Sequence, residues 1–70
     1  MTRHRVLVSP QMHRFGDGVK MTEPQGYSVE FYNAGGFVEE RSYSYSIEDE
    51  ALMSRRILHW VRFGRHVDEN

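Results

Sequence analysis

The segment from Ile47 to Phe63 constrains the fold more than any other part of the chain, because it carries a complete set of helix signals. Ser46 is a good N-cap residue, since its hydroxyl can accept a hydrogen bond from a free N–H group of the first turn. Residues 48–50 are all acidic, which suits the positive end of the helix macrodipole, and Gly64 can end the helix in left-handed geometry. We therefore predict one amphipathic helix over residues 47–63.

At 3.6 residues per turn, most apolar residues of this helix fall on one arc that we expect to pack against a sheet. The arc consists of Ile47, Ala51, Met53, Ile57, Leu58, Trp60 and Val61. A second row lies on the far side of the helix and contains Leu52, Arg56, His59 and Phe63. An exposed leucine and phenylalanine in this row indicate contact with a partner or a second copy. Cover by the chain's own segment from Gln11 to Gln25 is the alternative.

The residues before the helix predict β-structure. A β-branched run indicates a strand over residues 3–9, which Pro10 ends because proline has no N–H group to donate to a ladder. Alternating apolar and polar residues indicate a β-hairpin over 27–45, with its turn at residues 33–36, where asparagine and glycine tolerate positive φ. Residues 10–26 are interpreted as a loop or as an irregular hairpin.

Two details of these segments stay open in the sequence. If residues 10–26 form an irregular hairpin, Asp17-Gly18 is its turn. The second strand of the 27–45 hairpin alternates imperfectly, which a bulge near Glu39-Glu40 explains. A polar hairpin end that projects into solvent explains the same pattern.

The size of the chain allows one domain with one core, since it has only 70 residues. Together these elements predict an α+β fold, in which a small antiparallel sheet of three strands, or of four, packs against one C-terminal helix in the order β-β-β-α. Residues 64–70 form a tail, which we expect to fray from Val67 onward. Because the chain has no cysteine, its stability depends on close packing or on a partner subunit, such as a homodimer.

Several functional classes have little support in the sequence. No segment approaches the roughly 20 apolar residues of a membrane helix and no signal peptide is recognisable, so we expect a cytoplasmic protein without membrane contact. None of the four histidines lies within one helical turn of another, and no metal-binding motif is present. The sequence contains no nucleophile motif and no phosphate-binding glycine loop, so we expect no catalysis and no cofactor.

Charge and aromatic content favour protein binding. The net charge of -1 does not supply the positive field on which most nucleic-acid binders depend. The predicted hairpin combines Tyr32, which we expect on its surface, with the acidic residues Glu30, Glu39 and Glu40. We therefore expect a small protein-binding module, an inhibitor or adaptor of the size and composition common among phage and mobile-element proteins. Its candidate surfaces are this acidic hairpin and the outer helix row.

The alternative is a sheet-based nucleic-acid-binding or small transcription-regulatory protein. Some DNA-binding domains place strands in the major groove and follow them with a helix. In this interpretation the phosphate contacts come from Arg3, Arg5, Arg14 and Arg41. The acidic residues of the same hairpin would repel phosphate, which is why we favour a protein partner.

Overall fold

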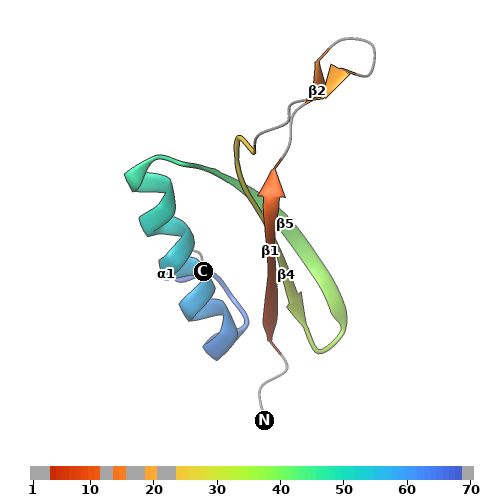
Figure 1. The fold of residues 1–70 in the computed structure, drawn as a ribbon. Helices are drawn as coiled ribbons and strands as arrows, with labels where there is room; N and C mark the ends of the chain where they lie inside the picture. Colours follow the sequence, from red (N-terminus) through yellow and green to blue (C-terminus); the bar gives the residue numbers. More distant parts are fainter. Residues whose placement is uncertain (1–3, 12–13, 16–18, 21–23, 69–70) are drawn as a thin grey trace.

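The computed structural model describes residues 4–11, 14–15, 19–20 and 24–68. Three strands form one antiparallel sheet in the order β1-β4-β5, with β1 at Arg5–Gln11, β4 at Gly26–Asn33 and β5 at Gly36–Ser44. The helix α1 spans Ile47–Phe63 and follows the sheet (Figure 1). This arrangement confirms the predicted α+β fold with a three-stranded antiparallel sheet and one C-terminal helix.

The segment between β1 and β4 contains two further short strands. β2 covers Arg14–Phe15 and β3 covers Val19–Lys20, and they pair with each other in a separate antiparallel ladder (Figure 1). Of the two interpretations of residues 10–26, the irregular hairpin therefore agrees with the structure. The turn predicted at Asp17-Gly18 lies outside the described residues.

The first strand continues through the proline at which we expected it to end. Pro10 is opposite Tyr27 and Gln11 is opposite Gly26 in the ladder between β1 and β4. Proline is tolerated because β1 is an edge strand, in which alternate N–H groups have no neighbouring strand to meet. The predicted end of this strand was wrong, because a proline interrupts a ladder only where its missing N–H group is needed.

The hairpin of β4 and β5 turns where the sequence places the turn. The Asn33 side chain accepts a hydrogen bond from the Gly35 N–H group at 2.8 Å, an arrangement that reproduces a backbone turn. Gly36 has a φ angle of 114°, which residues other than glycine rarely adopt. The local residue types are therefore sufficient to define this turn.

A bulge occurs in β5, but one position away from the predicted one. Phe31 is opposite Glu39 whereas the next residue, Tyr32, is opposite Phe37, so that Val38 is the extra residue. The insertion exchanges the two faces of the strand. As a result Glu39 lies on the same face as buried Phe31, and Phe37 lies on the opposite face with Tyr32.

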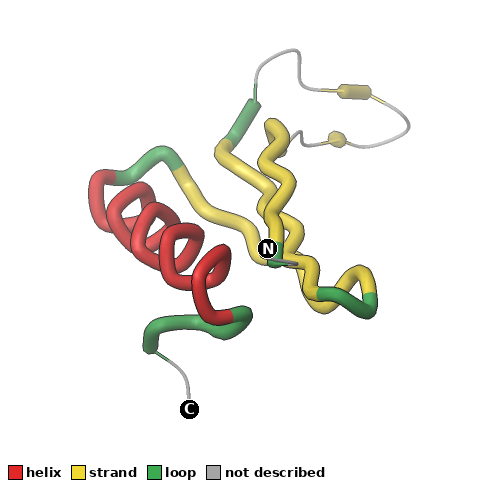
Figure 2. The backbone as a smooth tube through the Cα atoms, turned by 90° about the horizontal axis from the view of Figure 1, so that it is seen from below, coloured by secondary structure: helices red, strands yellow, loops and turns green. Residues whose placement is uncertain are grey.

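The core lies between α1 and one face of the sheet, and Figure 2 shows the helix on that side only. Its buried side chains are Val29, Phe31, Tyr43 and Trp60, with Val6, Tyr27, Leu52, Met53 and Ile57 packed around them. The Trp60 ring lies 5.0 Å from the Phe31 ring, and its Nε1 donates a hydrogen bond to the Tyr32 carbonyl at 2.8 Å. Trp60 therefore joins the helix to the central strand by packing and by a hydrogen bond.

The orientation of the helix differs from the predicted one. Met53, Ile57 and Trp60 face the core as expected, but Ile47 and Leu58 are 83% and 59% exposed, and Ala51 is exposed as well. Leu52, which the sequence places on the far side, packs against the core instead. The predicted arc was wrong at these positions because it counted every apolar residue equally, whereas the large Trp60 ring determines which side meets the sheet.

The ends of the helix agree with the prediction. The Ser46 hydroxyl accepts a hydrogen bond from the Asp49 N–H group at 3.0 Å, and Gly64 adopts left-handed geometry with its N–H group donating to the Trp60 carbonyl. The Asp49 carboxylate in turn accepts from the Ser44 N–H group at 2.8 Å. This hydrogen bond lowers the pKa of Asp49 and connects the end of β5 to the first turn of the helix.

Candidate functional site

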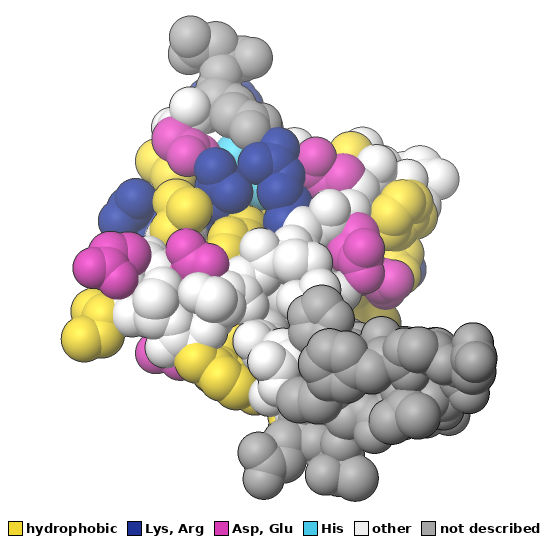
Figure 3. Space-filling model, turned by 90° about the horizontal axis from the view of Figure 1, so that it is seen from above, with side chains coloured by type: hydrophobic (Ala, Val, Ile, Leu, Met, Phe, Trp, Pro, Cys, Tyr) yellow, Lys and Arg dark blue, Asp and Glu magenta, His cyan; other side chains and the backbone are white. Residues whose placement is uncertain are grey.

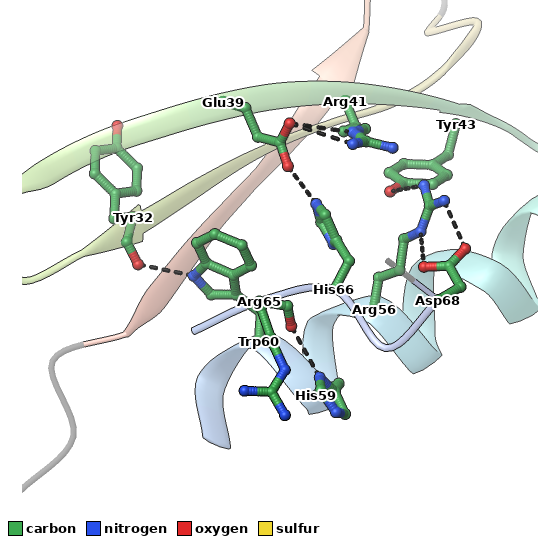
Figure 4. Close-up of polar contacts among 10 residues, drawn as sticks. All are labelled: Tyr32, Glu39, Arg41, Tyr43, Arg56, His59, Trp60, Arg65, His66 and Asp68. Carbon is green, nitrogen blue, oxygen red and sulfur yellow. Dashed lines mark hydrogen bonds and ion pairs between the residues drawn. The ribbon is translucent and has the colours of Figure 1, made fainter. Parts of the chain in front are cut away.

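The segment after the helix is folded onto the domain, which corrects the prediction that it frays from Val67. His66 is buried, and its ring lies 4.6 Å from the Phe31 ring and 5.1 Å from the Trp60 ring. Its Nε2 contacts the Glu39 carboxylate, as Figure 4 shows. The last two residues of the tail, 69–70, lie outside the described ranges. The described part of the tail therefore completes the core between helix and sheet.

Arg56 connects the tail to the sheet. Its guanidinium donates to the Asp68 carboxylate at 2.8 and 3.2 Å and to the Tyr43 hydroxyl at 3.2 Å (Figure 4). The hydrogen bonds from Arg56 hold the pKa of Asp68 below its ordinary value. The Arg56 side chain is only 12% exposed. Its position on an outward partner-binding row was therefore predicted wrongly, because Arg56 faces the tail and β5.

Glu39 belongs to a second polar group between helix and sheet. Arg41 donates to its carboxylate at 3.3 and 3.4 Å, and His66 contacts the other carboxylate oxygen. Figure 3 shows cationic side chains gathered around a histidine, with carboxylates on either side. Burial raises the pKa of Glu39, but the hydrogen bond from His66 and the charge of Arg41 outweigh it, so that the pKa is lowered. Glu39 is thus separated from Glu30 and Glu40, with which the sequence groups it.

Acid is expected to weaken the attachment of the tail through Glu39. A carboxyl group with a lowered pKa in the folded state stabilises the fold above its ordinary pKa of 4.5, and this contribution is lost as the pH falls through the lowered value. The melting temperature should therefore drop between about pH 7 and about pH 3. The variant Glu39→Gln can still accept from His66 but does not titrate, so its drop should be smaller.

Thermal unfolding followed by circular dichroism at the two pH values would measure this difference. The drop should not disappear in Glu39→Gln, because Asp49 and Asp68 also have lowered pKa values. An equal drop in the variant and in the wild type would show that Glu39 does not hold the tail.

The opposite face of the sheet carries no helix within the described part of the chain. Arg5, Tyr32 and Phe37 form a row across its three strands. The Arg5 guanidinium lies 4.5 Å from the centre of the Tyr32 ring, and the Phe37 ring meets the Tyr32 ring edge-on at 5.8 Å. Tyr32 is therefore packed between two neighbours and offers little free ring surface to a partner.

The next row of this face is acidic. Glu30 and Glu40 are directly opposite each other in the ladder of β4 and β5. The Tyr32 hydroxyl donates to Glu30 at 2.8 Å, and the Ser28 hydroxyl donates to Glu40. Two adjacent carboxylates repel a phosphate backbone, so this face is poorly suited to nucleic acid.

Two of the arginines proposed for nucleic-acid contact lie on opposite faces of the sheet. Arg41 lies on the helix side of the sheet beside Glu39, whereas Arg5 lies on the open side against Tyr32. Arg14 belongs to β2, and Arg3 lies outside the described residues. Arg5 and Arg41 therefore do not belong to one cationic face of the sheet.

A shallow groove of about 220 Å³, here called the outer groove, lies on the solvent side of the last turns of α1. Its lining residues are Arg55, Leu58, His59, Arg62, Phe63 and Val67. Phe63 and Val67 are 55% and 46% exposed, and the His59 ring lies 4.6 Å from the Phe63 ring. The His59 Nδ1 lies 2.8 Å from the Arg65 carbonyl oxygen, which holds the ring in place. The groove is lined by both apolar and cationic side chains.

Two of the four residues of the predicted helix row, His59 and Phe63, line the outer groove. The other two, Leu52 and Arg56, face inward. Leu58 and Val67 were not predicted as binding residues, because Leu58 was assigned to the core and Val67 to a frayed tail. The two arginines at positions 55 and 62, one on each side of Leu58 along the helix, are the sequence signal that could have located the groove.

Other kinds of site have less support in the structure. A second cavity of about 220 Å³ lies at one end of the sheet and is lined by Val8, Ser9, Pro10, Gly26, Tyr27 and Tyr45, which include no charged side chain. Among the described residues, no group of three or more histidine or acidic side chains is placed to hold a metal ion. Within the same ranges, no helix combines the length and apolarity needed to cross a membrane.

Comparisons with protein-family models, curated proteins and solved structures give no match for this chain.

Proposed function

We propose that this chain is a small non-catalytic protein-binding module, an inhibitor or adaptor that occupies a surface of a partner protein through the outer groove. The observation that carries the proposal is the group of exposed apolar side chains around this groove: Leu58, Phe63 and Val67. Adjacent exposed apolar side chains are typical of binding surfaces in small soluble proteins, because leaving them in water is unfavourable.

The arginines that line the groove point to the chemistry of the partner. Arg55 and Arg62 line the groove, and the Arg65 guanidinium lies 5.8 Å from the centre of the Phe63 ring. Arginine forms bidentate hydrogen bonds with carboxylates, and an apolar anchor surrounded by charge is a common arrangement at protein interfaces. The partner surface should therefore offer an apolar side chain flanked by carboxylates.

The acidic hairpin supports partner binding less strongly than the groove does. Its carboxylates Glu30 and Glu40 accept hydrogen bonds from within the sheet, and the face of the Tyr32 ring is covered by Arg5. Binding there would have to break these contacts. The groove residues Arg55 and Arg62, in contrast, form no ion pair with any described residue. Contact between these arginines and a partner therefore breaks no ion pair within the described part of the chain.

The double variant Leu58→Gln, Phe63→Gln should bind its partner at least about tenfold more weakly, equivalent to about 1.4 kcal/mol. Glutamine is a good helix former, so the fold should survive. Leu7→Gln is the matched control, because Leu7 is 55% exposed on the opposite side of the sheet. Affinity capture from extracts of the source organism with quantitative mass spectrometry would compare the three proteins. Proteins captured equally by all three would contradict the assignment of the groove.

A further inference from the structure

The outward face of α1 is complementary to itself, and we propose that the partner it binds is a second copy of this chain, with the two helices antiparallel. This inference rests on the proposed function, since it names the partner of the same surface.

An exposed apolar stripe runs along this face from the first turn to the outer groove. Ile47, Ala51 and Leu58 are spaced at i, i+4 and i+11, which places them on one side of the helix, with Ser54 between the last two. Among the residues that the structure describes, Ile47 is the most exposed of the large apolar side chains, at 83%. The small residues Ala51 and Ser54 in the middle of the stripe allow a second helix to approach closely, while the large residues at either end interdigitate.

Three charged side chains lie on one flank of this stripe, Glu48 near the start of the helix, Arg55 in its middle and Arg62 near its end. Glu48 lies in the acidic first turn and Arg62 in the basic last turn. Both are exposed, and neither forms an ion pair with any described residue. In an antiparallel pair overlapping along the whole helix, Glu48 of each copy is opposite Arg62 of the other, and the two Arg55 side chains are level with each other at the twofold axis. The symmetry forms the Glu48–Arg62 contact twice, which outweighs the single contact between the two arginines, and the two macrodipoles oppose each other favourably.

A parallel arrangement is disfavoured by the same charges, because it places acidic turns beside acidic turns and arginines beside arginines. The antiparallel arrangement also brings Ile47 of one copy to the level of Phe63 of the other, next to the outer groove. A twofold contact of this kind closes on itself, so that association stops at the dimer. The open faces of both sheets remain free.

Light scattering coupled to size-exclusion chromatography tests this proposal on the whole chain. Because one helix face is a small interface, the range from about 10 µM to about 1 mM is the appropriate one. The mass should rise from the monomer value of 8.3 kDa toward twice that value. Leu58→Gln should stay monomeric throughout this range, while Leu7→Gln should associate like the wild type.

Charge reversal tests the antiparallel geometry. Glu48→Arg and Arg62→Glu should each weaken association at least about tenfold, because each places like charges opposite one another. The double variant that exchanges the two charges should restore it. Circular dichroism of each variant, recorded well below its melting temperature, controls for loss of the helix.

The outcomes test self-association, the surface involved and the antiparallel geometry separately. A monomer at every concentration overturns self-association, and a dimer that persists in Leu58→Gln overturns the surface. Failure of the exchanged pair to restore association overturns the antiparallel arrangement. If the wild type is monomeric but captures a protein that the Leu58→Gln, Phe63→Gln variant does not, the proposed function stands and this inference fails.

Discussion

Replacing Trp60 with alanine should unfold most of the protein at room temperature. Trp60 is 3% exposed, packs against Phe31 and His66, and donates a hydrogen bond to the Tyr32 carbonyl. Removing a buried tryptophan typically costs about 3–5 kcal/mol, and a core of this size supplies only about 3–5 kcal/mol of stability. The loss of one side chain is therefore comparable with the whole free energy of unfolding. Far-UV circular dichroism and urea titration would measure it.

The matched control is Leu58→Ala, on the solvent side of the same helix. Because Leu58 is 59% exposed, its truncation should change the free energy of unfolding by less than about 0.5 kcal/mol. The comparison should be made at low protein concentration, where association does not contribute. Similar losses in the two variants would mean that the helix does not present Trp60 to the sheet and Leu58 to solvent.

Gly26→Ala should also destabilise the fold strongly. A methyl group at this position would lie 2.1 Å from the backbone carbonyl oxygen of Tyr43, which cannot rotate away as a side chain could. Gly26 is paired with Gln11 on one side and with Ser44 on the other, so β4 cannot shift without disturbing both ladders. We expect a loss of about 1–3 kcal/mol or more, measured as a lower urea midpoint.

Gly35→Ala separates this steric effect from a general effect of glycine replacement. The nearest atom to an added methyl group there is the Asn33 side-chain oxygen at 3.3 Å, which can move by a few tenths of an ångström. Its urea midpoint should therefore remain close to that of the wild type. A Gly26→Ala protein as stable as Gly35→Ala would show that β4 and β5 do not approach as closely as described.

The outer groove illustrates why a site on a small domain is hard to locate from sequence. Leu58 and Trp60 are two positions apart in the helix, and the apolar arc includes both. Only the contact between Trp60 and Phe31 shows which of them is buried and which is left for a partner. The predicted row is therefore divided by the structure, with His59 and Phe63 in the groove and Leu52 in the core.

The sequence by itself determined the elements whose signals lie within a few residues. Ser46 and Gly64 define the two ends of the helix, and Asn33 and the glycines that follow define the hairpin turn, because each acts through hydrogen bonds or φ angles in its own segment. The alternation of apolar residues in β4 likewise identifies its buried face without reference to the rest of the chain.

The tertiary structure alone decided how these elements meet. The bulge at Val38 turns Glu39 toward the helix, where it contacts His66, and Asp68 folds back to reach Arg56. These two contacts join residues that are 27 and 12 positions apart in the sequence, so no local sequence pattern predicts them. The rotation of the helix depends in the same way on the shape of Trp60 against the sheet. Packing therefore determined which apolar residues were left exposed, and with them the surface available to a partner.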